Sequence, residues 1–195
     1  MNWLRRRALL FYQRCRIAQF RFFSDCQNVS GRPVRNQPVL LTGKGRIEFL
    51  GVVNLGVIPS PHFLSGYIHI EARYPESIVQ IGDGVRINND TTIISEGPGV
   101  FIGKDTLIGS NCELIDSDFH ELHPARRTTG TPKRAKVVLG ENVLLGSNVR
   151  VLKGVEIGRN SVIGNGSIVS RSIPENVVAV GSPARPGVEL LTDSP

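Results

Sequence analysis

The stretch LGENVLLGSNVRVLKGVEIGRNSVIGNGSIV, from Leu139 to Val169, repeats every six residues. Each hexad begins with an aliphatic residue, and Gly follows that residue in four of the six hexads that start at Leu139, Leu145, Val151, Ile157, Ile163 and Val169. This period matches neither a helix nor a simple strand alternation. It predicts short strands joined by tight turns, in which each aliphatic residue stacks on its counterpart one coil away.

The same hexads occur earlier in the chain and fall into groups of three. They start at Ile81, Ile87, Ile93, Ile102, Ile108 and Leu114, with a fainter pair at Ile47 and Val53. Gly and Asn follow many of the stacked positions and suit turns that need a positive φ. The sequence therefore predicts an all-β fold, a parallel β-helix of hexapeptide repeats.

The repeat is interrupted once at length, between Leu114 and Leu139. These residues are 25 positions apart where the period allows six, so about 19 residues form a loop that protrudes near residues 115–138. This loop contains His120, His123 and several acids. Because loops on rigid scaffolds often carry function, we expect the chemistry here. A second excursion, Ile58–Gly66, interrupts the early coils and has no assigned role.

The first 23 residues differ from the rest of the chain in charge. They contain six arginines and no acid, and the remaining 17 basic residues balance 17 acids. A neutral body makes nucleic acid an unexpected partner. The arginines also exclude a signal peptide and a membrane span. An apolar face of Leu4, Ala8, Phe11, Cys15, Ala18 and Phe22 predicts a basic amphipathic helix, which packs on protein or lies on an anionic membrane.

We expect three parts along the chain: the basic amphipathic helix in residues 1–26, the β-helix in residues 27–185 and a C-terminal tail in residues 186–195. Three cysteines without a CxxC motif argue against a disulfide framework or a cysteine zinc site. A reducing cytoplasm fits them best, with the helix as a peripheral contact on the inner face of the membrane.

From Ile47 to Arg185, the hexads together with the SDFH motif at Ser117–His120 resemble the left-handed β-helix of the hexapeptide-repeat acyltransferases. The similarity is to the sugar O-acetyltransferase branch, which includes galactoside and maltose acetyltransferases and polysaccharide-biosynthesis enzymes. The resemblance implies a homotrimer that transfers an acetyl group directly from acetyl-CoA to a sugar hydroxyl. Because the basic helix is suited to a membrane surface, we expect the acceptor to be a small sugar or a lipid-linked glycan of cell-surface polysaccharide or lipopolysaccharide biosynthesis.

The resemblance also implies site residues. His120 matches the general base, and an imidazole with a pKa near ~6.5 suits that role; His123 is the competitor. An acid of the loop, Asp116, Asp118 or Glu121, is a candidate to orient the imidazole. The acceptor contacts implied are Asn88, Glu96 and Asp118. The coenzyme A contacts implied are Ser147, Asn165, Ser170, Arg171 and Arg185, the arginines being suited to phosphates.

Two other functions remain open, and a third is disfavoured. An N-acyltransferase acting on a nucleotide-linked amino sugar would use the same fold, and a non-catalytic repeat scaffold would need no activity at all. A metal enzyme on a β-helix needs three converging His ligands. The four histidines, His62, His69, His120 and His123, lack the expected spacing, so we expect no metal.

Overall fold

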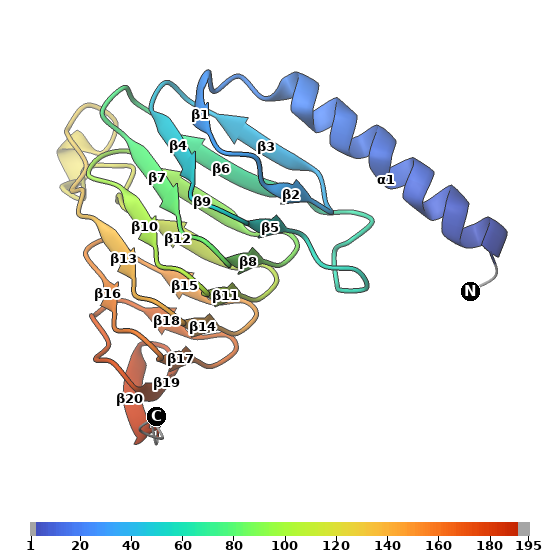
Figure 1. The fold of residues 1–195 in the computed structure, drawn as a ribbon. Coiled ribbons are helices and arrows are strands. Elements are labelled where there is room, and N and C mark those ends of the chain that lie inside the picture. Colours follow the sequence, from blue (N-terminus) through green and yellow to red (C-terminus); the bar gives the residue numbers. More distant parts are fainter. Residues whose placement is uncertain (1–2, 191–195) are drawn as a thin grey trace.

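The computed structural model describes residues 3–190 and consists of one helix followed by a prism of short strands (Figure 1). The helix α1 spans Trp3–Phe23 and projects from one end of the prism. From β1 to β18, successive strands lie in three sheets in turn, and each coil places one strand in each sheet. All pairings between these strands are parallel except that of the last two. The predicted parallel β-helix is therefore confirmed.

The three faces of the prism are named sheets A, B and C. Sheet A contains β1 (Asn28–Ser30), β4 (Arg46–Phe49), β7 (Ile78–Ile81), β10 (Val100–Ile102), β13 (Val137–Leu139) and β16 (Glu156–Ile157). Sheet B contains β2 (Val34–Arg35), β5 (Asn54–Leu55), β8 (Arg86–Ile87), β11 (Leu107–Ile108), β14 (Leu144–Leu145), β17 (Val162–Ile163), β19 (Val177–Gly181) and β20 (Ala184–Glu189). Sheet C contains β3 (Val39–Thr42), β6 (Ile68–Ala72), β9 (Thr92–Ser95), β12 (Glu113–Ile115), β15 (Arg150–Val151) and β18 (Ile168–Val169).

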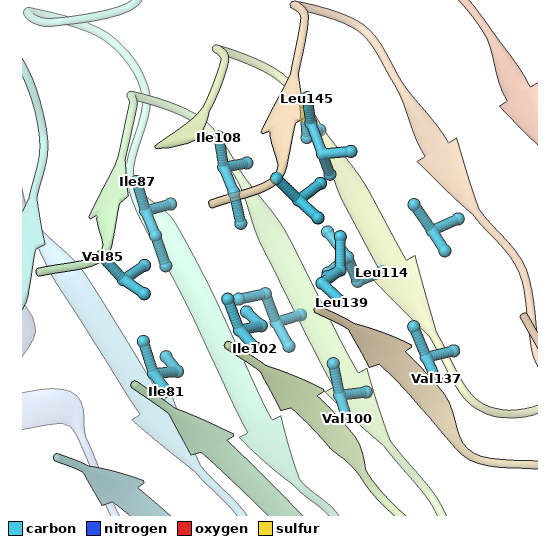
Figure 2. Packing of buried hydrophobic residues seen from close by; sticks show 14 of the residues in the cluster. Ile81, Val85, Ile87, Val100, Ile102, Ile108, Leu114, Val137, Leu139 and Leu145 are labelled. Carbon is cyan, nitrogen blue, oxygen red and sulfur yellow. The ribbon is translucent and has the colours of Figure 1, made fainter. Parts of the chain in front are cut away.

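The aliphatic residues that open the hexads form the core. In sheet A, Ile81 pairs with Ile102, which pairs with Leu139 on the next coil, and all three are at most 3% exposed. Figure 2 shows these side chains stacked inside the prism. Burying one such side chain stabilises the fold by roughly 1.5–3 kcal/mol. A single coil cannot bury its inner face alone, so the stacking of coils is what makes the interior continuous.

Turns with left-handed backbone make the corners. Asn142, Asn160 and Asn176 have φ values of 54°, 60° and 60°, a conformation that Asn tolerates better than most residues. Their side chains also form a ladder, because Asn142 Nδ2 donates to Asn160 Oδ1 at 3.1 Å and Asn160 Nδ2 to Asn176 Oδ1 at 2.7 Å. The predicted positive-φ turns are therefore present, and stacked amides link successive coils.

Two of the three corners carry insertions. The corner between sheets B and C, the B–C corner, carries residues 56–67 after β5. The corner between sheets C and A, the C–A corner, carries residues 116–136 after β12, with the short 3-10 helix η1 (Pro124–Arg126). In Figure 1 these insertions project from different sides of the prism. We call residues 116–136 the long loop.

Helix α1 is held by the excursion at the B–C corner. Gln13, which is 3% exposed, donates from Nε2 to the carbonyl of Phe63 at 2.6 Å. Arg16 donates to the carbonyls of Phe63 and Gly66 at 3.2 and 2.8 Å. The ring of Phe20 lies 4.8 Å from that of Tyr67. The excursion that the sequence left without a role thus serves as the support for α1.

The C-terminal end closes sheet B. Strand β19 pairs in parallel with β17, and β20 turns back antiparallel to β19. The expected C-terminal tail begins inside β20, and its last residues, 191–195, lie outside the described residues, as do residues 1–2 of the expected N-terminal part. Between residues 3 and 190, no helix combines the length and hydropathy that a membrane span requires.

Candidate active site

The long loop leaves the C–A corner on two paired stems. The amide of Asp118 donates to the carbonyl of Lys133 at 3.0 Å, and the amide of Ala135 donates to the carbonyl of Asp116 at 2.9 Å. Ser117 and Arg134 form an antiparallel bridge between these bonds. The loop is therefore supported at its base, although it is an interruption of the repeat.

Asp116 fastens the first stem to the coil before it. Its side chain is fully buried, and Oδ1 accepts the amide of Glu96 at 2.7 Å. Oδ2 accepts a hydrogen bond from Ser95 Oγ at 2.8 Å and two more from the amides of Gly97 and Gly99 at 3.2 and 2.9 Å. Because both oxygens are used inside the corner, this carboxylate shapes the C–A corner and has no bond to His120.

His120 is exposed on the long loop, and its ring orientation is set by one contact. Nδ1 lies 3.2 Å from the carbonyl oxygen of Arg127. A carbonyl only accepts hydrogen bonds, so this contact requires the proton of the neutral imidazole to be on Nδ1. Nε2 then carries the lone pair, which is the arrangement that a general base needs.

His123 has the opposite arrangement. It caps η1, and its Nδ1 accepts the amide of Ala125 at 3.3 Å. The proton of its neutral ring is therefore on Nε2. Of the two loop histidines, only His120 presents an unprotonated Nε2 in this geometry. Glu121, a candidate to orient the base, accepts the amide of His123 at 3.3 Å instead.

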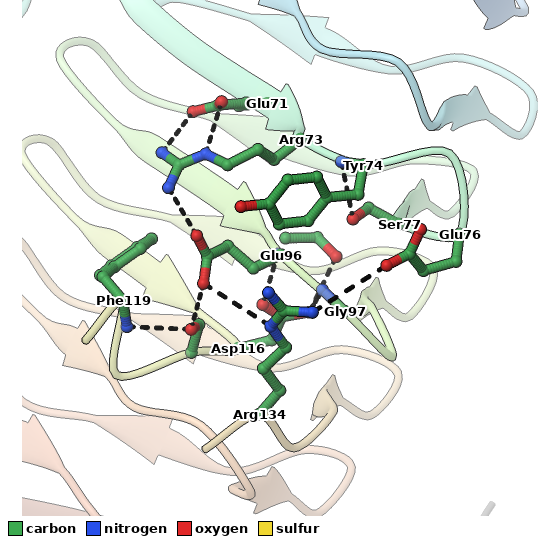
Figure 3. A network of polar contacts seen from close by, with 12 residues as sticks. Glu71, Arg73, Tyr74, Glu76, Ser77, Glu96, Gly97, Asp116, Phe119 and Arg134 are labelled. Atoms are coloured by element: carbon green, nitrogen blue, oxygen red, sulfur yellow. Dashed lines mark hydrogen bonds and ion pairs between the residues drawn. The ribbon is translucent and has the colours of Figure 1, made fainter. Parts of the chain in front are cut away.

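Glu96 lies beneath the loop inside a network of charged groups (Figure 3). Its side chain is 4% exposed; Arg73 Nη1 donates to Oε1 at 2.7 Å, and Arg134 Nε lies 3.7 Å from Oε2. Ser117 Oγ donates to the same Oε2. Arg73 also binds Glu71 through two nitrogens at 2.8 and 3.0 Å. The bond to Glu71, with further help from Glu96, raises the pKa of the Arg73 guanidinium, so its charge is permanent.

Asp118, the third implied acceptor contact, pairs with the coil below. Lys153 Nζ lies 2.7 Å from its Oδ1. Lys153 follows β15 and therefore occupies the same C–A corner one coil further on. Ser170 and Arg171 follow β18 at this corner too, and both are exposed. The C–A corner thus brings His120, Glu96, Asp118, Ser170 and Arg171 onto one edge of the prism.

The other implied site residues lie on different edges. Asn88 is at the B–C corner, and strand β9 separates it from Glu96 at the C–A corner. The Oδ1 of Asn88 accepts a hydrogen bond from the amide of Asn89 at 2.7 Å. Ser147 is at the same corner, where its amide donates to Asn165 Oδ1 at 2.8 Å. Arg185 is exposed on β20. One chain therefore carries the implied site as separate parts and does not bring His120 together with Asn88.

The sequence did not predict the polar support under the loop, which consists of three cations and one hydroxyl: Arg73, Arg134, Lys153 and Ser117. When the coils are aligned on one another, Arg73, Glu96 and Lys153 each fall just after a strand of sheet C. The alignment of successive coils could therefore have predicted that these charged residues lie near one another. Within residues 3–190, no three His, Cys, Asp or Glu side chains gather as metal ligands would.

The chain matches two descriptions of repeat families. Residues 136–171 match "Bacterial transferase hexapeptide (six repeats)", and residues 99–115 match "Hexapeptide repeat of succinyl-transferase". The solved structure of an N-acyltransferase, AntD from Bacillus cereus, superposes with a TM-score of 0.68 at 17% identity, covering 89% of each chain. The fold and repeats thus define a hexapeptide-repeat protein with the left-handed parallel β-helix fold, as predicted.

Within this class, the chain is similar to galactoside acetyltransferases. It is 43% identical over 105 residues to the galactoside O-acetyltransferase of Lactococcus lactis, covering 54% of this chain and 50% of the relative. The chain therefore spans half the length of that curated relative. A solved galactoside acetyltransferase in complex with coenzyme A is 26% identical with a TM-score of 0.55, covering 96% of this chain and 80% of that one. The predicted resemblance to hexapeptide-repeat acetyltransferases is confirmed.

Proposed function

We propose that the protein is an acetyl-CoA-dependent O-acetyltransferase that acts on a sugar hydroxyl, with His120 as the general base. The observation that carries this proposal is the contact of His120 Nδ1 with the Arg127 carbonyl, which leaves Nε2 able to accept a proton. The similarity to galactoside acetyltransferases, one of them in complex with coenzyme A, supports the donor and the acceptor class.

The proposed reaction is a direct transfer. His120 Nε2 accepts the proton of the sugar hydroxyl as its oxygen bonds to the thioester carbonyl carbon. The carbon–sulfur bond then breaks, and the imidazolium returns the proton to the departing thiolate. The products are the acetyl ester and free coenzyme A. General base catalysis of this kind contributes ~10²–10⁴-fold to the rate.

The separated site residues fit an assembly of three chains. We place the B–C corner of one chain beside the C–A corner of its neighbour, so that Asn88 of one chain joins His120 of the next. Leu107 and Leu144 pair on the outer face of sheet B and are 43% and 40% exposed. An apolar strip on a flat sheet is suited to burial between subunits. Cyclic symmetry would produce three equivalent sites.

In that assembly the remaining residues have defined roles. Asn88, Asp118 and Glu96 form the acceptor side of the site, with Glu96 beneath the loop. Ser147, Asn165 and Ser170 line the groove for coenzyme A. Arg171 and Arg185 are exposed and bind its phosphates, because a guanidinium recognises phosphate with two parallel hydrogen bonds.

We also propose that α1 lies on the inner face of a membrane, where a lipid-linked glycan for a cell-surface polysaccharide would be acetylated. The residues that hold α1, Gln13 and Arg16, are on one side of the helix. Phe11 and Phe22 are 70% and 84% exposed on the opposite side. Such an apolar stripe on an arginine-rich helix suits an anionic membrane surface.

The test is an acceptor screen with the full-length protein and acetyl-CoA, read by release of free thiol. We expect release with at least one sugar hydroxyl acceptor above the rate of thioester hydrolysis. Mass spectrometry of the product locates the acetyl group on oxygen or nitrogen. Thiol release only with amino sugars would overturn the proposal in favour of an N-acyltransferase, and no release with any acceptor would favour a scaffold.

A further inference from the structure

Ser117 joins the buried carboxylate of Glu96 to the backbone that precedes His120. Its side chain is 2% exposed, and its Oγ donates to Glu96 Oε2. The same oxygen accepts the amide of Phe119 at 2.9 Å. We call these three groups the Ser117 bridge. The bridge joins two successive coils, because Glu96 and Ser117 are 21 residues apart in the chain.

The carboxylate decides how the hydroxyl is oriented. A serine hydroxyl has one proton to donate and two lone pairs to accept with. Since a carboxylate only accepts, the proton of Ser117 must point at Glu96, and a lone pair is left for the amide of Phe119. Arg73 and Arg134 also hold positive charge beside the Glu96 carboxylate, at 2.7 and 3.7 Å from its two oxygens.

Phe119 is the residue that this arrangement controls. Its φ of 59° is left-handed, a conformation that costs energy for an aromatic residue and persists where surrounding contacts impose it. The amide of Phe119 is bound by Ser117, and its ring lies 5.1 Å from the Arg73 guanidinium. Both contacts lead back to Glu96, because Arg73 donates to Glu96 at 2.7 Å.

We propose that Glu96 and Ser117 are positioning residues that hold the left-handed turn at Phe119 and so fix where the next residue, His120, presents its imidazole. The proposal rests on the function proposed above, in which His120 is the base. Glu96 then acts from beneath the loop through Ser117. A hydrogen-bonded carboxylate buried under a catalytic loop is a means to preorganise the base.

The first test replaces Ser117 with Ala and compares it with Ser77→Ala. Ser77 is a matched control because it is 1% exposed and its Oγ likewise accepts a hydrogen bond from one backbone amide, that of Tyr74 at 3.1 Å, which lies outside residues 116–136. Hydrogen exchange is measured on the free protein. We expect exchange of the Phe119 amide to rise at least about tenfold in Ser117→Ala, and to be unchanged in Ser77→Ala.

A second measurement follows His120 itself. Nitrogen-15 NMR of histidine-labelled protein distinguishes the two neutral tautomers, and we expect the parent signal of His120 to report the proton on Nδ1. In Ser117→Ala and in Glu96→Gln this signal should shift or broaden. The glutamine side chain of Glu96→Gln would present an amide N–H₂ that opposes either the Ser117 proton or the Arg73 guanidinium. Ser117→Thr keeps the hydroxyl and should restore the parent signal.

Turnover provides the third readout. Displacement of a base by about 1 Å costs up to ~10²-fold, so kcat should fall by about 10–100-fold in Ser117→Ala while KM for acetyl-CoA stays within about twofold. Unchanged Phe119 exchange and His120 signals in Ser117→Ala would overturn the proposal. Full activity of His120→Ala would instead overturn the proposed function, and the two results are independent because exchange and NMR need no turnover.

Discussion

The backbone amide of Glu96 donates a 2.7 Å hydrogen bond to Oδ1 of Asp116, a residue 20 positions further along the chain and one coil below. Asp116 opens the long loop, and Glu96 opens the corner on which that loop rests. The bond therefore joins the interruption of the repeat to the repeat itself. This contact allows an exposed loop to present His120 from a fixed starting point.

Replacing Asp116 with Ala should destabilise the fold strongly. The carboxylate is fully buried and accepts four hydrogen bonds, whose donors would lose their partner. We expect the free energy of unfolding to fall by about 3 kcal/mol, measured by urea denaturation. Asp83→Ala is the control, since Asp83 is exposed and accepts the amide of Val52 at 2.6 Å. Equal losses in the two variants would contradict this account.

The two loop histidines should differ in their effect on turnover. Removing His120 removes the proposed base, so His120→Ala should lower kcat by ~10²–10⁴-fold. His123→Ala removes a ring whose Nδ1 caps η1 and should retain most of the activity. Steady-state thiol release with a sugar acceptor measures both. Comparable losses in the two variants would contradict the assignment of His120 rather than His123 as the base.

The sequence predicted the interior of the fold better than its first coil. Hexads reveal β4, β5 and β7 to β18, because each inward residue, such as Ile81 or Ile102, is covered from both sides and must be aliphatic. Strands β1–β3 form one more coil before the hexads begin. Among the strands of residues 3–190, β1 pairs only with β4, so packing constrains its residues from one side and leaves no clear period.

The site could be predicted in part. His120 was selected as the candidate base because the loop breaks the period. The partners of Glu96 were not predicted, because Arg73 and Ser117 lie on other coils and meet Glu96 only through the register. The amphipathic pattern of α1 predicted a helix correctly. It did not show that Gln13 faces the protein while Phe11 faces outward, since that choice depends on the excursion at the B–C corner.

Stability should fall in mild acid because of His69. Burial lowers the pKa of His69 from its usual 6.5, and the nearby charge of Glu71 opposes this only in part. The unfolded chain then binds the proton more readily than the folded one. The contribution of neutral His69 to the free energy of unfolding is therefore complete above pH 6.5 and is lost as the pH falls below it. Gln can keep the 3.0 Å contact with Thr42 Oγ1. The melting temperature of His69→Gln should therefore drop less than that of the parent between about pH 7.5 and 5.5; equal drops would contradict this.

The assembly should depend on the outer face of sheet B. Leu107 and Leu144 lie side by side there, and an arginine at either position would bury a charge between subunits. We expect the proposed trimer to dissociate to single chains in a Leu107→Arg, Leu144→Arg double variant, as measured by light scattering after gel filtration. Glu156→Arg, on the exposed face of sheet A, is the control. A double variant with the parent mass would place the subunit contact elsewhere.

Helix α1 should bind anionic vesicles through the side that faces away from the prism. Six arginines without an acid attract phosphatidylserine, at about 1 kcal/mol for each residue near the surface, and this attraction weakens with salt. Phe11 and Phe22 would insert between the lipids, so Phe11→Glu with Phe22→Glu should weaken binding at least about tenfold. The control Leu50→Glu alters an exposed apolar residue of the prism and should bind as the parent does. The same apolar stripe would also suit a contact between two chains. Failure of the parent to bind vesicles, together with loss of self-association in the double variant, would therefore assign the outward face to a contact between chains.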